Sequence, residues 1–78
     1  MTRFFMHYKA LLGVVPKTLY EVVGHTIDTD GLQARVSYKD TQTGVVFSRL
    51  ASEFYGVVEV GKKLHLRFQP VDAEGVPL

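Results

Sequence analysis

The sequence predicts an all-β fold, a small SH3-like and partly open barrel of five to six short antiparallel strands with at most one helical turn. Three observations predict it. The chain has 78 residues, enough for one domain only. Apolar and polar side chains alternate with period two along several segments, and each segment ends at turn-forming residues. Strands this short cannot build two thick sheets, so one bent sheet that curls on itself is the economical arrangement. We expect a single barrel domain over residues 1–71 and a frayed tail over residues 72–78.

The clearest strand signals lie in residues 32–39 and 64–69. In each segment every second side chain is apolar and the intervening ones are polar, as in a strand with one buried face. Pro70 ends the second segment. From this alternation, the side chains predicted to be buried are Leu32, Val36, Tyr38, Leu66 and Phe68. The side chains predicted to lie outside are Arg35, Lys39, His65 and Arg67.

Shorter runs of β-branched and aromatic side chains predict further strands at residues 19–24, 45–49 and 57–60. Residues 4–12 fit both a strand and one face of a helix. Their aromatic content and the lack of an N-cap signal favour a strand. One helical turn is predicted at residues 52–55, with Ser52 as its cap.

Two turns are predicted between strands, at residues 28–31 and 40–44, and each ends in a glycine. A backbone with positive φ favours glycine because glycine has no Cβ. We therefore expect at least one of Gly31 and Gly44 to have a positive φ.

Composition restricts the classes of function. Nine basic and eight acidic residues give a formal charge of +1, whereas proteins that bind nucleic acid through phosphates usually carry a clear basic excess. The chain has no cysteine, so disulfides, thiolate metal sites and thiol nucleophiles are excluded. The apolar stretch at residues 4–12 is interrupted by His7 and Lys9, so it predicts neither a signal peptide nor a membrane span. We expect a cytoplasmic protein.

Six short motifs follow one another along most of the chain. They are His7-Tyr8-Lys9, Leu19-Tyr20-Glu21-Val22-Val23-Gly24, Val36-Ser37-Tyr38-Lys39-Asp40, Phe47-Ser48-Arg49-Leu50 with Phe54, Val58 to Lys62, and Arg67-Phe68-Gln69-Pro70-Val71. In this order they resemble the motifs of a small bacterial domain family of unknown function, the one numbered sixteen fifty-three. In that family a tryptophan stands at the position of Phe47 and a proline at that of Leu50. The resemblance supports the fold and aligns Arg49 with an arginine of the family, which has no settled activity.

No motif in the sequence predicts catalysis or a cofactor. Asp28, Asp30 and Gly31 are similar to the start of a calcium loop, but Gln33 and Arg35 do not supply the further ligands. The three histidines, His7, His25 and His65, lack the spacing of helical metal ligands. The serines lack the G-x-S-x-G context of a nucleophile. We therefore expect a protein that is not an enzyme and holds no metal or cofactor.

Arg49 is the first candidate binding residue. It lies at the end of residues 45–49, beside the predicted helical turn. A structural role would be to cap the carbonyls of that turn or to pair with Glu21 or Glu53. A functional role would be to bind an anion or a carboxylate of a partner, and the sequence favours neither over the other.

Two further groups of residues are candidates for partner binding. The first is a cationic patch on the polar strand faces, whose members are Arg35, Lys39, His65 and Arg67. The interpretation that the sequence favours for this group is instead an ordinary solvated face that keeps the domain soluble. The second is a shallow aromatic groove formed by Tyr8, Tyr20, Phe47 and Tyr55. The alternative for the aromatic residues is a position at the edge of the core.

The sequence thus predicts a non-catalytic binding or protein-interaction module with an unidentified protein or peptide partner. One alternative is a single-stranded nucleic-acid binder that uses the aromatic side chains for stacking and Arg35, Lys39 and Arg67 for phosphates; the near-neutral charge makes nucleic acid a less favoured partner. Another is a homo-oligomer that completes its core by strand pairing or by packing Phe4 and Phe5 on a neighbour.

Overall fold

The computed structural model describes residues 4–78 and confirms the all-β class. Within these residues there are seven strands and two single-turn helices, more than the five to six strands and one turn expected. The strands are β1 (Phe4–His7), β2 (Tyr20–Asp28), β3 (Gln33–Asp40), β4 (Val46–Leu50), β5 (Val57–Val60), β6 (Lys63–Leu66) and β7 (Phe68–Val71). The helices are α1 (Tyr8–Leu11) and α2 (Ala51–Phe54).

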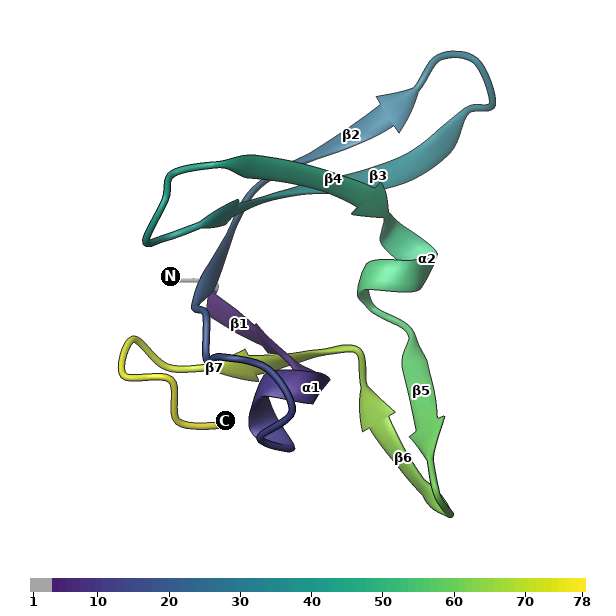
Figure 1. Ribbon diagram of the computed structural model, residues 1–78. Helices are drawn as coiled ribbons and strands as arrows, with labels where there is room; N and C mark the ends of the chain where they lie inside the picture. The colour runs from purple at the N-terminus through teal and green to yellow at the C-terminus, as the bar shows by residue number, and fades with distance from the viewer. Residues whose placement is uncertain (1–3) are drawn as a thin grey trace.

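The strands form two antiparallel sheets and no closed barrel (Figure 1). The larger sheet has the order β4-β3-β2-β1-β7, and β5 pairs only with β6. Strand β2 pairs with β3 over its whole length but with β1 only at Tyr20 and Glu21. The sheet bends at this short contact, so β4, β3 and β2 lie above β1 and β7 in Figure 1. Strands β4 and β7 therefore remain the two edges of the sheet.

One cluster of buried rings fills the space inside the bent sheet. Its buried members are Val36, Tyr38, Phe54 and Phe68. The rings of Phe54 and Phe68 are stacked with centroids 4.3 Å apart. Phe54 comes from α2 and Phe68 from β7, so this contact joins the helix to the far edge of the sheet. We call the sheet face that carries Val36 and Tyr38 the inner face.

A second buried cluster lies on the other side of β1. It consists of Met6, Ala10 and Val71, with Phe4 and Leu19 packed against it. Alternation along β1 supplies both clusters, because Phe5 packs against the first and Met6 belongs to the second.

The expected strand over residues 4–12 is wrong beyond His7, where the chain turns into α1. His7 has an extended backbone and its Nδ1 accepts a hydrogen bond from the N–H of Lys9 at 3.3 Å. A histidine therefore provides the helix cap, and the sequence signals for caps favour Ser, Thr, Asp and Asn instead. The turn brings Ala10 into the second cluster with Met6.

The prediction of which side chains are buried and which face outward is correct for the middle of β3 and for β7. Val36, Tyr38 and Phe68 are buried as expected, with exposed fractions of 0%, 6% and 4%. None of the four polar side chains predicted to lie outside is fully buried.

The predictions for Leu32 and Leu66 are wrong, because these side chains are 78% and 39% exposed. Leu32 lies in the turn before β3 with a φ of 52°. Leu66 ends β6, and the chain bends at Arg67, which resets the alternation before Phe68. Within β6 it is His65 that is half-buried.

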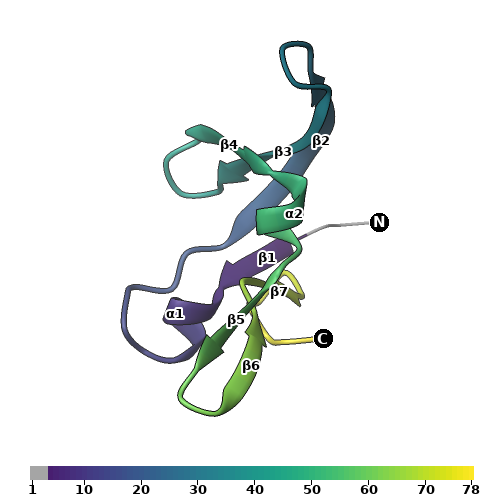
Figure 2. The same ribbon diagram turned by 90° about the vertical axis from the view of Figure 1, so that its right-hand side faces the viewer.

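The tail, expected to be frayed, makes specific contacts. The Asp72 carboxylate oxygen accepts hydrogen bonds from the N–H groups of Glu74 and Val76, each at 2.9 Å. Pro77 bridges to Val71, and the N–H of Leu78 donates to the carbonyl of Pro70 at 3.1 Å. These contacts lay residues 72–78 along the outer edge of β7, on the right-hand side of the sheet in Figure 2.

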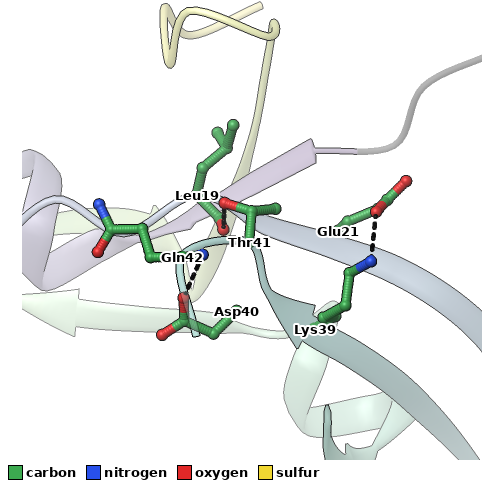
Figure 3. Close-up of polar contacts among 6 residues, drawn as sticks. All are labelled: Leu19, Glu21, Lys39, Asp40, Thr41 and Gln42. Carbon is green, nitrogen blue, oxygen red and sulfur yellow. Dashed lines mark hydrogen bonds and ion pairs between the residues drawn. The ribbon is translucent and has the colours of Figure 1, made fainter. Parts of the chain in front are cut away.

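Polar contacts fix the turn between β3 and β4, and with it the start of β4 (Figure 3). Oδ1 of Asp40 accepts hydrogen bonds from the N–H groups of Gln42 and Thr43, at 2.8 and 3.1 Å. The hydroxyl and N–H of Thr41 donate to the carbonyl of Leu19 at 2.8 and 3.1 Å. These bonds tie the turn to the chain just before β2.

We predict that Gly44→Ala lowers the free energy of unfolding by about 1–2 kcal/mol, since a Cβ is strained at left-handed φ. The φ of Gly44 is 78°, and a Cβ there would meet no neighbouring atom, so the cost is backbone strain alone. Gly31 does not have a positive φ, and Gly31→Ala is the matched control, expected to change stability by less than about 0.5 kcal/mol. Urea denaturation measures both. Equal losses in the free energy of unfolding for the two variants would contradict the left-handed backbone conformation of Gly44.

Candidate functional site

Arg49 and Phe47 of β4 lie on the inner face of the sheet. In the β3–β4 register Arg49 is opposite Val36 and Phe47 is opposite Tyr38. Residues directly opposite each other in antiparallel strands point to the same face. The two β4 side chains therefore share the face of the buried core, at its open margin.

The guanidinium of Arg49 contacts aromatic side chains. Its Nε donates to the hydroxyl of Tyr38 at 3.4 Å, and its central carbon is 5.5 Å from the centroid of the Phe68 ring. The hydrogen bond is long, and the position over the ring is a cation–π contact. Arg49 is half-buried, so both contacts hold the guanidinium at the rim of the core.

Arg49 does not make the contacts that the sequence suggested. Arg67, not Arg49, caps the helical turn, because its Nε donates to the carbonyl of Glu53 at 3.0 Å. Glu21 forms an ion pair with Lys39, with 3.5 Å between Nζ and Oε1, on the outer side of the sheet. The structural role considered for Arg49 thus belongs to Arg67.

Aromatic side chains surround this guanidinium on the inner face. The Tyr38 ring has centroid distances of 5.5 Å to Tyr20, 5.7 Å to Phe47 and 5.3 Å to Phe68. The His7 ring meets the edge of Phe68 at 5.1 Å. We call these six residues the inner-face cluster: His7, Tyr20, Tyr38, Phe47, Arg49 and Phe68.

The electrostatic environment of the inner-face cluster is cationic at His7, while Asp40 acts on Tyr20. Burial, and then the charges of Arg49, Lys9 and Arg67, lower the pKa of His7 below its ordinary value. Burial, followed by Asp40 and Tyr38, raises the pKa of Tyr20, with Arg49 acting in the opposite direction. Both groups are thus held neutral near pH 7.

No carboxylate balances Arg49. Every acidic side chain of the chain lies within residues 4–78, and Lys39–Glu21 is the one ion pair within 4.0 Å among these residues. A half-buried arginine normally gains a carboxylate or several carbonyls. Here the guanidinium has one phenol hydroxyl and an aromatic face, so its remaining N–H groups are available to an external acceptor.

Three of the predicted site residues come together and the others do not. Arg49, Tyr20 and Phe47 belong to the inner-face cluster, and Tyr8 lies at its border with its ring 4.6 Å from that of His7.

Tyr55 contacts no member of the inner-face cluster directly: its ring packs on Phe54 with centroids 4.9 Å apart, and its hydroxyl is 2.8 Å from Nε2 of His25. Arg35 donates to the Ser48 hydroxyl at 2.8 Å on the outer face.

Sequence reasoning missed His7, Tyr38 and Phe68 as members of the site. Tyr38 and Phe68 were recognised only as core residues, because alternation reports burial and not which ring lies beneath the arginine. Their contact with Arg49 depends on the register of β3 with β4 and on the fold that brings β7 beneath it. His7 carried a usable signal, because it opens the first of the family-like motifs.

The chemistry available to the inner-face cluster is binding through one fixed cation, two phenol hydroxyls and ring faces. In residues 4–78 no group of three or more His, Asp or Glu side chains lies close enough to hold a metal ion. Over the same residues, no helix has the length and hydropathy needed to cross a membrane.

By fold, the molecule is a small all-β domain with an open sheet. The chain belongs to the family described as "Protein of unknown function (DUF1653)", whose sequence pattern matches residues 3–70. The resemblance found from the short motifs is therefore confirmed. Comparison with curated proteins and with solved structures gave no match.

We predict that His7 makes the protein less stable in mild acid. Its pKa in the folded state is below the ordinary value of 6.5, so the unfolded chain takes up the proton first as the pH falls. The stabilisation is fully present above pH 6.5 and is lost as the pH falls through the folded pKa. Protonation also removes the Nδ1 acceptor that caps α1.

Urea denaturation between about pH 7.5 and 5.5, above the range in which carboxylates titrate, measures this effect. His7→Gln is expected to lose less stability than the wild type over that range. An equal loss in the two proteins would show that His7 does not contribute.

Proposed function

We propose that this protein is a non-catalytic binding module that recognises a carboxylate group of its partner through Arg49. The observation that supports the proposal is a half-buried guanidinium, held by the Tyr38 hydroxyl and the Phe68 ring, with no carboxylate of its own chain. A carboxylate can accept two parallel N–H bonds from the planar guanidinium fork.

The surroundings of Arg49 favour an anion with an apolar body. Phe47 is 43% exposed beside it, and the Tyr20 ring is half-buried on the same face. Aromatic side chains exclude water from the guanidinium, and partial desolvation strengthens a charge-assisted hydrogen bond.

A singly charged ligand fits better than a doubly charged phosphate. Arg49 is the one permanent cation of the inner-face cluster, and His7 is held neutral near pH 7. A carboxylate matches this single charge, whereas a phosphate dianion usually takes several cationic or N–H donors.

The placement of the other cations weakens the nucleic-acid alternative. Arg35 and Lys39 lie on the outer face with Ser48 and Glu21 as partners, and Arg67 is used to cap α2. Phosphate tracking needs a continuous basic groove beside the stacking rings. The non-catalytic role, the cytoplasmic location and the protein or peptide partner expected from the sequence stay part of this proposal.

The first test is titration with benzoate, a singly charged carboxylate with an aromatic body, followed by NMR. The Arg49 side-chain N–H signal and the amides of Phe47 and Tyr38 should shift, with a dissociation constant on the order of 1–10 mM for one such contact. Benzamide, which has the same shape without the charge, should leave these signals in place, and sodium chloride keeps the ionic strength constant.

Substitution separates binding from stability. Arg49→Lys keeps the charge but not the planar fork, so it should weaken benzoate binding at least about fivefold and lower stability by less than about 1 kcal/mol. Arg67→Lys is the matched control: it should lower stability through the lost cap and leave benzoate binding unchanged. Benzoate binding that is the same in wild type and Arg49→Lys would overturn the proposal.

A further inference from the structure

The outer side of β4 is an open strand edge. β4 is the last strand of the larger sheet, and no other strand lies along its outer side in Figure 1 or Figure 2. Asp40 donates its backbone N–H to the carbonyl of Val45. Because inward and outward groups alternate along an antiparallel strand, the N–H groups of Val46, Ser48 and Leu50 face outward. Within residues 4–78, no backbone hydrogen bond reaches them from another segment.

The other edge of the same sheet is protected. Pro70 lies within β7 and has no N–H to offer, Pro77 bridges to Val71, and Leu78 donates to the Pro70 carbonyl. Edge strands are commonly protected in these ways against pairing with other chains.

Edge strand β4 lacks the proline and the covering segment that protect β7. It contains no proline and no lysine, and Val46 and Phe47 are 56% and 43% exposed. Its one charged residue, Arg49, is half-buried and faces inward. An apolar, uncovered edge of this kind is typical of a surface that receives a β-strand from a partner.

We propose that β4 receives an extended peptide segment of a partner protein, which adds a sixth strand to the sheet and places an acidic side chain on Arg49. This inference rests on the proposed function and names its partner. Neighbouring strands lie about 4.8 Å apart, and side chains directly opposite have Cβ atoms about 4.5–5.5 Å apart. An aspartate or glutamate opposite Arg49 therefore lies on the inner face, within reach of the guanidinium.

The position of Phe47 on β4 also specifies a second residue of the added strand. Residues two apart on an added strand share a face, so the residue two positions from the acidic one lies opposite Phe47. An apolar or aromatic side chain suits that place. The expected recognition motif is an acidic and an apolar residue separated by one residue, in an order set by the direction of the added strand.

Charge argues against the pairing of two β4 edges from two copies of this chain. β4 reads Val-Phe-Ser-Arg-Leu and contains no acidic residue. Pairing of two β4 edges would leave both Arg49 side chains without a carboxylate while adding a second cation nearby. An extended partner segment with an acidic side chain supplies the carboxylate that Arg49 lacks.

The test is selection from a displayed library of random ten-residue peptides, on the wild type and on Arg49→Gln. We expect wild-type selection to enrich peptides with an acidic residue and an apolar residue two positions away. Arg49→Gln should lose the preference for the acid. Lys62→Gln, which removes an exposed cation in the β5–β6 turn, is the matched control and should select the same motif as the wild type.

One enriched peptide is then synthesised in three forms: unchanged, with the acid replaced by its amide, and with N-methyl groups at the backbone positions that pair with β4. Each change should weaken binding at least tenfold. In hydrogen exchange the unchanged peptide should protect the amides of Val46 and Ser48.

Failure to enrich any peptide, enrichment without an acidic position, or full binding of the N-methylated form would each overturn the strand-addition inference. So would a dimer seen by sedimentation without peptide, together with protection of the Val46 and Ser48 amides in that dimer. Benzoate binding at Arg49 tests the proposed function separately, because the binding of benzoate requires no strand pairing.

Discussion

The structure depends on the stacked pair of Phe54 and Phe68. Their ring centroids are 4.3 Å apart, and the contact joins α2 to β7, two elements that share no strand pairing. The sheet that connects them is open and bends where β2 meets β1 over only two residues. An open sheet of this size buries little apolar surface, so the ring cluster inside the bend is needed to hold its two parts together. Tyr38 and Val36 complete the cluster from β3.

The candidate site rests on the same rings. Phe68 packs on Phe54 with one part of its surface and lies beneath the Arg49 guanidinium with another. A half-buried cation without a carboxylate is unfavourable for folding, and an apolar residue of similar volume would serve the core at least as well. A residue that makes folding less favourable in this way is expected at a functional site. Arg67, which caps α2 and so contributes to stability, shows what a structural arginine in the same chain does.

Sequence alternation predicted the β class and the buried side chains of β3, because that strand is flanked on both sides and the irregularity in its pairing, between Val22 and Gly24, lies on β2. It failed for Leu66, because period two continues from Leu64 to Phe68 in the sequence while the backbone bends at Arg67. It failed for α1 because a histidine provides the cap.

The candidate site was predictable only in part. Arg49, Phe47 and Tyr20 were recognised by residue type, but their grouping needed the register of three strands and the bend of the sheet. Tyr55 has the same residue type as Tyr20 and pairs with His25 elsewhere.

In the proposed complex, the open edge of β4 and the Arg49 guanidinium contact the same partner segment. Backbone pairing along β4 accepts any extended segment, because N–H and C=O groups carry no sequence information. Arg49 adds selectivity, because a segment with no acid opposite it would further bury a cation without compensation. A segment with an acid relieves the imbalance that the folded chain already contains. An inward-facing charge on an edge strand hinders pairing with other chains, and here it would admit only a segment that supplies an acid.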